Sequence, residues 1–508
     1  MKALYEVAQI RAVEQAAASA LAPGALMERA GEAAARLALD LLAQVRVRQV
    51  LVLAGPGNNG GDALEVAANL ARAGVDVTVI HLPGTAAPAP ETARALARAR
   101  SGSAQFVSEP SDAFDGLVID GLFGIGLARP LAGQARELVS RINALALPVL
   151  ALDVPSGLDA DTGAIVGPDG VALRASATIS FIADKPGLHT ADGHDVAGEV
   201  HVAALGIDPS LLKGARAALS EPALFAAQLA PRRQNSHKGS YGDVAVIGGA
   251  PGMGGAAILA ARAALYTGAG RVFVAAVGAA PALDSSQPEI MMREAASFDA
   301  GARTLVLGPG MGDSAEAIRL LAEALDGAAP LVLDADALNL VAASIDLQQR
   351  VARRAGATLM TPHPLEAARL LGTSSAEVQC DRLTAARTLA ARHRAVVVLK
   401  GSGSIIARAD GQVAINPTGN PGLASGGTGD VLSGMCGSLL AQGWPAWEAA
   451  LGAVWMHGAA ADWLVAHGVG PVGMTAGELA GAARAVFNQL VKNQLERRGL
   501  TAGGRRRS

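Results

Sequence analysis

Residues 420–434 read NPGLASGGTGDVLSG, and apolar residues at helical spacing follow this stretch at Met435, Leu439 and Leu440. The pattern predicts a flexible loop that leads into the N-terminus of a helix. Such an end presents unpaired backbone N–H groups and a partial positive charge, so it favours phosphate oxygens or a developing oxyanion. Asp430 lies among these donors. A carboxylate in that place can deprotonate a hydroxyl that accepts a phosphoryl group, or it can simply cap the helix.

The length and composition of the chain predict two α/β domains. At 508 residues the chain is too long for one ordinary core. Hydrophobic residues make up 51% and aromatic residues 3%, so we expect cores of Ala, Val, Leu and Ile. The 61 glycines gather at the ends of apolar runs, which is typical of βα turns. We expect one domain over residues 1–220, a second over 221–492, and a disordered tail over 493–508.

The net charge and the number of cysteines indicate which partners and which cellular compartment to expect. The net charge of −3 gives no reason to expect a nucleic acid or an anionic membrane as partner. The two cysteines form neither a disulfide framework nor a metal-ligand pattern, which suits a reducing compartment. Charged residues interrupt the first 20 positions, and no long run lacks both charges and glycines, so we expect neither a secretory segment nor a membrane span. The sequence therefore predicts a soluble, cytoplasmic protein.

The first half of the chain predicts a mainly parallel sheet in a three-layer domain. Two helices are expected within residues 1–45, separated at Pro23-Gly24. The strand run QVLVLA (49–54) precedes GPGNNGGD (55–62), which we interpret as a glycine-rich turn before a helix. Further strands are expected at 76–81, 117–119, 149–152, 177–182 and 199–202. Polar clusters at 120–130 and 153–163 follow two of them, and the carboxyl ends of parallel strands are where ligands bind.

The second half predicts another doubly wound sheet with its ligand face along one edge. Residues 211–230 are expected to form a linker plus a helix. Strands are expected at 242–248, 271–277, 304–307, 331–334, 357–360 and 395–399, with a hairpin over 405–416 about Asp410-Gly411. Glycines and polar residues follow most of these strands. No internal repeat relates the two halves, so they are expected to be separate folds.

Three loops of the first half resemble the signature loops of the NAD(P)H-hydrate epimerase family. They are GPGNNGGD, DGLFGIGLARP and DVPSGLDADTG, and the match covers roughly residues 1–215. The resemblance implies a Rossmann-like domain, a potassium ion held by Asn59, Asp120 and Ser156, and an acid/base role for Asp153. It also implies a set of residues that line the substrate: Asn58, Asn59, Gly60, Gly61, Asp62, Gly124, Ile125, Gly126, Leu127, Ala128, Arg129, Pro130 and Asp153.

One departure from the epimerase pattern follows the first loop. The family continues NNGGD with glycine and an aromatic residue, whereas this chain has Ala63 and Leu64. If glycine is needed there for close backbone approach or positive φ, the first domain is weakened. A binding module without catalysis is therefore the alternative interpretation of this domain.

The second half resembles the ribokinase-like family, and more narrowly the ADP- or ATP-dependent NAD(P)H-hydrate dehydratases. The motifs LGPGMG, LDADALN, TPHPLE, KGSGS and NPGLASGGTGDVLSG stand in the family's order within residues 230–490. The resemblance implies two sets of residues. Lys400, Gly401, Ser402, Gly403, Ser404 and Gly429 would bind an adenine nucleotide with Mg²⁺, and Ala256, Gly312, His363 and Asp430 would bind the hydrated nicotinamide.

Several of these residues also have an alternative interpretation as purely structural residues. His363 lies between two prolines, and its alternative interpretation is a purely structural role. Lys400 follows a strand, and its alternative interpretation is a solvated surface charge. Asp334 and Asp336 either position magnesium through water or cap a helix.

The two resemblances together imply the repair of hydrated NADH and NADPH. The first domain would interconvert the two epimers, and the second would dehydrate one of them, with ADP favoured over ATP as phosphoryl donor and AMP and phosphate as products. The alternative is a small-alcohol kinase fused to a non-catalytic nucleotide-binding module. We also expect a homo-oligomer. The choice between NADH hydrate and NADPH hydrate is left open.

Overall fold

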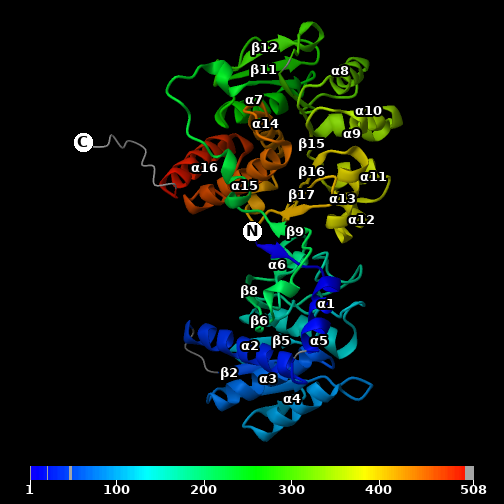
Figure 1. The fold of residues 1–508 in the computed structure, drawn as a ribbon, viewed down its shortest axis with the longest axis vertical. Helices are drawn as coiled ribbons and strands as arrows, with labels where there is room; N and C mark the ends of the chain where they lie inside the picture. The colour runs from blue at the N-terminus through cyan, green and yellow to red at the C-terminus, as the bar shows by residue number, and fades with distance from the viewer. Residues whose placement is uncertain (1, 20, 45–48, 112, 302, 498–508) are drawn as a thin grey trace, which may run out of the picture. The chain divides into compact units, whose positions relative to one another are not determined.

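The computed structural model describes residues 2–19, 21–44, 49–111, 113–301 and 303–497 (Figure 1). The chain divides into two compact units, one over Ala3–Ala217 and one that begins at Ala218 and includes Lys2. This division falls beside the predicted boundary near residue 220. A search of the described residues found no helix long and apolar enough to cross a membrane.

The first unit contains a parallel sheet with the strand order β4-β3-β2-β5-β6-β7-β8. Its strands are β2 (Gln49–Ala54), β3 (Asp76–His81), β4 (Gln105–Val107), β5 (Leu117–Gly121), β6 (Val149–Leu152), β7 (Ala177–Phe181) and β8 (Glu199–Ala203). Its helices are α1 (Val7–Ala18), α2 (Ala25–Gln44), α3 (Asn58–Arg72), α4 (Pro90–Ser101), α5 (Gly133–Leu145) and α6 (Gly193–Val196). The predicted strands are all present, and only the short β4 was missed.

Successive side chains of β2 point to opposite faces of the sheet, which explains the three layers of this unit. Val50 and Val52 pack into the core on the side of α2 and α3, whereas Leu51 and Leu53 pack on the side of α5. A strand buried on both faces is typical of a parallel sheet covered by helices. In the register, Leu53 lies opposite Asp120, which brings the carboxyl ends of β2 and β5 to the same edge.

The short strands β1 (Ala3–Leu4) and β9 (Ala217–Leu219) lie at the two limits of the first unit along the chain. The helix expected within 211–230 is a wrong prediction: these residues, all described, contain only β9 and 3₁₀ turns such as Pro222–Leu224 and Ala226–Gln228. Gly214 has a φ of +72°, and Phe225 and Leu229 are buried in the core of the second unit. Tertiary packing of these two side chains therefore outweighs the helix propensity of the alanines.

The second unit orders its strands β18-β17-β16-β15-β14-β13-β10-β11-β12. They are β10 (Asp243–Gly248), β11 (Arg271–Ala276), β12 (Met291–Glu294), β13 (Thr304–Leu307), β14 (Leu331–Leu333), β15 (Thr358–Met360), β16 (Val396–Leu399), β17 (Ile405–Ala407) and β18 (Val413–Ile415). The strands from β12 to β16 are parallel, and the predicted hairpin is confirmed by the antiparallel pairing of Ile405 with Ile415.

Helices cover both faces of the second sheet, as Figure 1 shows with α14, α15 and α16 on one side and α8 to α13 on the other. They are α7 (Gly254–Tyr266), α8 (Ala315–Asp326), α9 (Ala335–Ala343), α10 (Ile345–Arg353), α11 (Pro364–Leu371), α12 (Ser375–Cys380), α13 (Arg382–His393), α14 (Thr428–Ala441), α15 (Ala446–Ala466) and α16 (Ala476–Arg497). Helix α16 thus runs beyond residue 492, and the rest of the expected tail, 498–508, lies outside the described residues.

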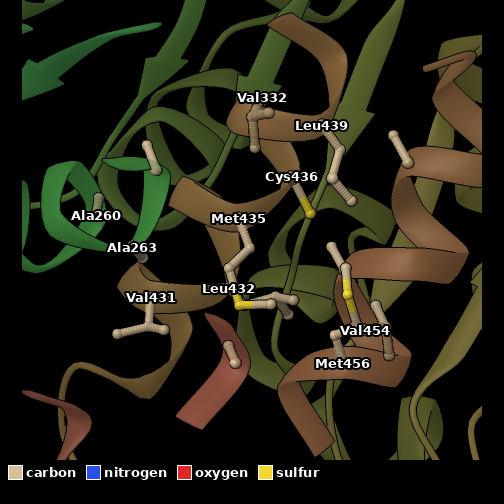
Figure 2. Close-up of a cluster of buried hydrophobic side chains, with 14 of the residues drawn as sticks. Ala260, Ala263, Val332, Val431, Leu432, Met435, Cys436, Leu439, Val454 and Met456 are labelled. Carbon is tan, nitrogen blue, oxygen red and sulfur yellow. The ribbon is translucent and has the colours of Figure 1, made fainter. Parts of the chain in front are cut away.

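Helix α14 is held by a core of small and aliphatic side chains. Figure 2 shows Met435, Cys436 and Leu439 of this helix beside Ala260 of α7 and Met456 of α15. Each buried Leu or Met contributes roughly 1.5–3 kcal/mol through removal from water. Glycines allow the close approach, because a Cβ on Gly434 would lie 2.0 Å from the carbonyl oxygen of Ala260, and one on Gly437 would lie 2.4 Å from Cγ2 of Val306.

Candidate active sites

The first candidate site lies at the carboxyl edge of the first sheet, where β2 passes into α3. Helix α3 begins at Asn58, so Asn58, Asn59, Gly60, Gly61 and Asp62 lie in its first turns and not in an extended turn as predicted. The reason is steric. A Cβ on Gly55 would lie 1.8 Å from the carbonyl oxygen of Leu122, and one on Gly60 would lie 1.9 Å from that of Gly55. The glycines let the helix start directly against the strand ends.

Asp120 and Ser156 form a buried hydrogen-bonded pair at this edge. The Asp120 carboxylate accepts from the Ser156 hydroxyl at 2.6 Å and from the Ser156 backbone N–H at 2.8 Å. Both residues are fully buried. Burial raises the pKa of Asp120, and the hydrogen bonds from Ser156 oppose that rise. The structure therefore brings together two of the three residues expected at a potassium ion.

Asn59, the third expected ligand, has a buried side-chain amide without a partner among the described residues. Neither its Oδ1 nor its Nδ2 makes a hydrogen bond, although the residue is only 8% exposed. A Cβ on Gly124 would lie 3.2 Å from Cγ of Asn59 and 3.0 Å from Oδ2 of Asp153, so this amide faces the same space as Asp153. Leaving a buried polar group unpaired costs about 1–3 kcal/mol, which favours a ligand at this place.

Asp153 follows β6 directly and adopts a φ of +67°, which is unusual for a residue other than glycine. Its Oδ1 lies 2.8 Å from Nζ of Lys185, and its Oδ2 accepts from the backbone N–H of Ile125 at 3.2 Å. Sequence reasoning missed Lys185. Its signal was a charged residue just after the strand predicted at 177–182, and in the structure β7 pairs with β6.

Two further carboxyls lie near Asp153. Burial, followed by the negative charges of Asp153 and Glu14, raises the pKa of Asp62 well above its ordinary value. Burial and the charge of Asp153 likewise raise the pKa of Glu14, a residue of α1 that sequence reasoning did not single out. Both carboxyls are therefore harder to ionise than an exposed carboxyl.

The loop after β5 only partly reaches this cluster. Gly124 and Ile125 contact Asp153 as described, whereas the rest of the predicted substrate loop continues outward and is mostly exposed: Gly126, Leu127, Ala128, Arg129 and Pro130. Ala63 and Leu64, the departures from the family pattern, are fully buried in the core of α3. A Cβ on Gly121 would lie 2.4 Å from the Ala63 methyl group, so Ala63 packs beneath the end of β5.

The second candidate site lies at the N-terminus of α14. Gly427 precedes the helix with a φ of +89°, and Asp430 lies in its first turn. Burial and the charge of Asp334 raise the pKa of Asp430 to about 7, although Lys400 opposes the rise. A carboxyl with this pKa can accept a proton at neutral pH, as a general base must.

Lys400 links the strand ends of this site. Its Nζ lies 2.8 Å from Oδ1 of Asp334, 3.9 Å from Oε2 of Glu366, and 3.2 Å from the place where a Cβ on Gly429 would stand. Burial works against the charged ammonium, but Asp334 and Glu366 outweigh it and raise the pKa of Lys400. Its side chain is 19% exposed and paired, so the alternative of a solvated charge is wrong.

Three acidic residues belong to this site: Asp334, Asp336 and Glu366. Asp334 precedes α9 without a side-chain capping bond among the described residues, whereas Asp336 accepts from the backbone N–H of Gly312 at 2.8 Å. Helix capping is therefore wrong for Asp334. Burial raises the pKa of Glu366 to about 7, with a further contribution from Asp334.

His363 combines a structural contact with a place in the cluster. Its Nδ1 accepts from the backbone N–H groups of Leu365 and Glu366, which caps α11, and its Nε2 lies 3.2 Å from Oε1 of Glu366. Burial and the neighbouring Lys400 lower the pKa of His363. The neutral ring with its proton on Nε2 satisfies all three contacts.

The KGSGS loop is supported by a buried arginine that sequence reasoning missed. Arg382 is fully buried and donates to the carbonyl oxygens of Leu399 and Lys400 at 3.3 Å each. Gly401 has a φ of +143°, and a Cβ there would lie 2.6 Å from the Arg382 guanidinium. Ser404 closes the turn by donating to the carbonyl oxygen of Gly401 at 3.0 Å, with Ser402 and Gly403 between them.

The remaining two predicted substrate residues lie on neighbouring segments. Ala256 lies in the first turn of α7, and a Cβ on Gly310 would lie 3.3 Å from its methyl group. Gly312 has a φ of +70° and is tied to Asp336, whose charge also raises the pKa of Asp430. The structure therefore brings Gly312, Lys400, His363 and Asp430 to one edge of the sheet.

Comparison with known proteins identifies the family. The family model described as NAD(P)H-hydrate dehydratase matches residues 244–483, and the one described as YjeF-related protein N-terminus matches residues 23–187. The bifunctional NAD(P)H-hydrate repair enzyme Nnr of Escherichia coli strain K12 is 39% identical, over 92% of this chain and 90% of that protein. The enzyme of the same name from Coxiella burnetii is 38% identical, over 96% of this chain and all of that protein.

Among solved structures, the ADP/ATP-dependent NAD(P)H-hydrate dehydratase of Bacillus subtilis, co-crystallised with ATP and Mg²⁺, is 29% identical and has a TM-score of 0.47. The match covers 54% of this chain and 98% of that one. The identity to the full-length relatives extends across both units and both candidate sites. The chain therefore belongs to the family of bifunctional NAD(P)H-hydrate repair enzymes, with an epimerase half and a dehydratase half.

Proposed function

We propose that Asp430 is the general base of the dehydratase half and that ADP is its phosphoryl donor. Asp430 takes the proton from the ring hydroxyl as that oxygen attacks the terminal phosphoryl group, and the nucleotide P–O bond breaks to release AMP. The ring C–O bond then breaks, phosphate leaves, and loss of a proton from the adjacent carbon restores the C=C bond. The observation that carries this proposal is a carboxyl with a pKa of about 7 in the first turn of a helix, beside a lysine.

The residues around Asp430 fit a nucleotide with its metal ion. Lys400 and the N–H groups at the start of α14 supply positive charge for phosphate oxygens, and the KGSGS loop follows β16 at the same edge. Asp334 and Asp336 offer the oxygen ligands that Mg²⁺ prefers and would hold it through water. The ion would offset the negative charge of the phosphates.

In the epimerase half we propose that Asp153 is the acid/base group. Hydration of an enamine places the hydroxyl on the carbon bonded to nitrogen, so the hydrated ring is a carbinolamine. Asp153 takes the hydroxyl proton, the O–H electron pair becomes a C=O bond, and the C–N pair moves to nitrogen as the ring opens. Closure on the other face of the carbonyl, with return of the proton, gives the second epimer.

A potassium ion fits the residues beside Asp153. Asn59, Asp120 and Ser156 supply oxygen atoms, which hard cations prefer. The unpaired Asn59 amide and the buried Asp120 carboxylate support a cation there. It would orient the substrate and lower the cost of burying the Asp120 charge. The cytoplasmic location and the homo-oligomer stay predictions.

Recovery of NADH absorbance from a mixture of both hydrate epimers tests the assignment. The full chain is incubated with ADP, with ATP and without nucleotide. We expect full recovery with ADP, with AMP and phosphate as products. Recovery with ATP alone would contradict the donor. Recovery that slows sharply once one epimer is used would contradict the epimerase assignment, and a stable phosphorylated product would favour a kinase.

A further inference from the structure

The Lys185 ammonium is fully buried in the first unit and is saturated with acceptors. Its Nζ lies 2.8 Å from Oδ1 of Asp153 and 2.7 Å from the hydroxyl of Ser180, and it donates to the carbonyl oxygens of Phe181 and Ala183 at 3.2 and 3.3 Å. Moving a charge out of water is strongly unfavourable unless it is paired and hydrogen-bonded. The contact with Asp153 therefore gives this enclosed side chain its acidic partner.

The backbone around this pair is specialised to bring the two side chains together. Asp153 and Ile182 lie just after the neighbouring strands β6 and β7, and their φ values are +67° and +70°. Such conformations cost roughly 1–3 kcal/mol each in residues other than glycine. The Asp153 N–H donates to the carbonyl oxygen of Ile179 at 2.8 Å, and Ser180 donates to that of Ala183 at 2.8 Å. Lys185 and Asp153 are thus held by rigid strand ends.

Two further carboxyls lie near Asp153. Asp62 faces the cluster from α3 and Glu14 from α1, with Glu65 and Arg11 as their further charged neighbours. Burial and the charge of Asp153 raise the pKa of both Asp62 and Glu14. The direct ion pair joins Lys185 to Asp153, at 2.8 Å between Nζ and Oδ1.

We propose that Lys185 is the positioning residue of the epimerase half: it holds Oδ1 of Asp153 through the buried ion pair and leaves Oδ2 to take the proton of the substrate hydroxyl. This inference rests on the proposed role of Asp153. Oδ2 is the oxygen that faces Gly124 and Ile125 at the start of the loop after β5. Lys185 itself is enclosed by protein and does not contact the substrate.

The test uses the full chain with the substitutions Lys185→Met, Lys185→Arg and Asp153→Asn, and Lys213→Met as the matched control at an exposed lysine of the same unit. Epimerisation is followed without nucleotide, so the dehydratase half does not contribute. We expect Lys185→Met to lower kcat by about 100-fold with KM changed less than about threefold, because a base that is no longer held in place loses most of its general-base contribution. The acidic limb of its pH–rate profile should move to higher pH, because the carboxylate has lost its counter-ion.

The Lys185→Arg variant distinguishes a positioning role of Lys185 from a purely structural one. Lys185→Arg keeps the positive charge, so we expect its acidic limb to return towards that of the unsubstituted enzyme with kcat partly restored. Equal losses in both lysine variants, with a lower melting temperature and an unmoved acidic limb, would overturn the inference. An unchanged kcat in Lys185→Met would overturn it as well. Full activity of Asp153→Asn would instead overturn the role of Asp153 itself, which distinguishes the two failures.

Discussion

The carboxylates Asp153 and Asp430 differ in how completely the protein itself satisfies their charges. Asp153 is paired with a lysine that has no exposed surface and four protein acceptors. Asp430 lies at a helix N-terminus beside Lys400, which is partly exposed and already paired with Asp334. At the first site the protein itself supplies the charged partner of Asp153. The second contains a carboxyl with a pKa of about 7 in the first turn of a helix. This difference is consistent with one reaction that moves a single proton and another that needs a highly charged co-substrate.

The largest expected effect comes from removing the proposed base of the second site, Asp430. Asp430→Asn should lower kcat for dehydration by about 10³-fold or more, because the amide cannot accept the hydroxyl proton. Nucleotide binding, measured by calorimetry with ADP and Mg²⁺, should change less than about threefold, and epimerisation should be unaffected. Asp326→Asn, at an exposed carboxylate of the same unit, serves as the control. Dehydration at an undiminished rate would remove Asp430 from the mechanism and end the contrast between the two sites.

A smaller effect is expected from the unpaired amide of the first site. Asn59→Ala should lower epimerisation by roughly 10–100-fold and raise the K⁺ concentration needed for half-maximal rate, because one oxygen ligand is lost. Asn69→Ala, at a half-buried asparagine of the same helix whose Oδ1 accepts from Arg72, is the matched control. Thermal unfolding of both variants with K⁺ or Na⁺ adds a readout that does not depend on activity. If K⁺ shifts neither the melting temperature nor the rate of the unsubstituted enzyme, the potassium assignment fails.

The nucleotide loop of the second site should respond more mildly. Gly401→Ala places a methyl group against the Arg382 guanidinium at a φ of +143°, so the KGSGS loop must shift. We expect KM for ADP to rise by about tenfold, since phosphate contacts through backbone groups depend on sub-ångström placement, while kcat stays within about threefold. Gly481→Ala in α16, where a Cβ meets open space, is the comparison. An unchanged KM would show that this loop does not contact the nucleotide.

The smallest expected effect is on stability and its pH dependence. The pKa of Asp430 is raised from 3.8 to about 7 in the folded chain, so the folded state binds a proton that the unfolded state has released. Its contribution to stability is fully present below about pH 4 and is lost as the pH rises through about 7. Asp430→Asn escapes this loss and should be more stable by roughly 1 kcal/mol at pH 8, with no such gain at pH 4. Urea unfolding at both pH values checks the sign.

Most of the fold followed from short-range patterns in the chain. Buried strand runs such as QVLVLA were confirmed because a strand covered by helices on both faces must be apolar throughout. The helix expected within 211–230 failed because Phe225 and Leu229 pack into the second unit, which no local pattern records. The strands β4 and β12 were missed because neither is a continuous buried run, and the short strands β1 and β9 were missed as well.

The candidate sites were predicted to the extent that their residues stand next to glycine-rich strand ends. Asp120, Ser156, Lys400 and Asp430 belong to such segments and do gather at sheet edges. Sequence patterns did not reveal Lys185, Glu14 and Arg382, because only the folded chain brings these side chains to their sites. Arg382 begins a helix 18 positions before Lys400, yet its guanidinium contacts the carbonyl oxygen of that residue. Such contacts depend on tertiary folding and leave no periodic trace in the sequence.

The contact between α14 and α7 limits which substitutions the chain tolerates. Gly434 and Ala260 meet through backbone and methyl groups, so trimming side chains there removes almost nothing. Enlargement is different, because a Cβ at Gly434 already falls 2.0 Å from a carbonyl oxygen. Single-base changes of a glycine codon produce only larger residues. Random mutation therefore meets Gly434 as a one-sided constraint: every substitution there adds volume against the backbone of α7, on the helix that carries Asp430.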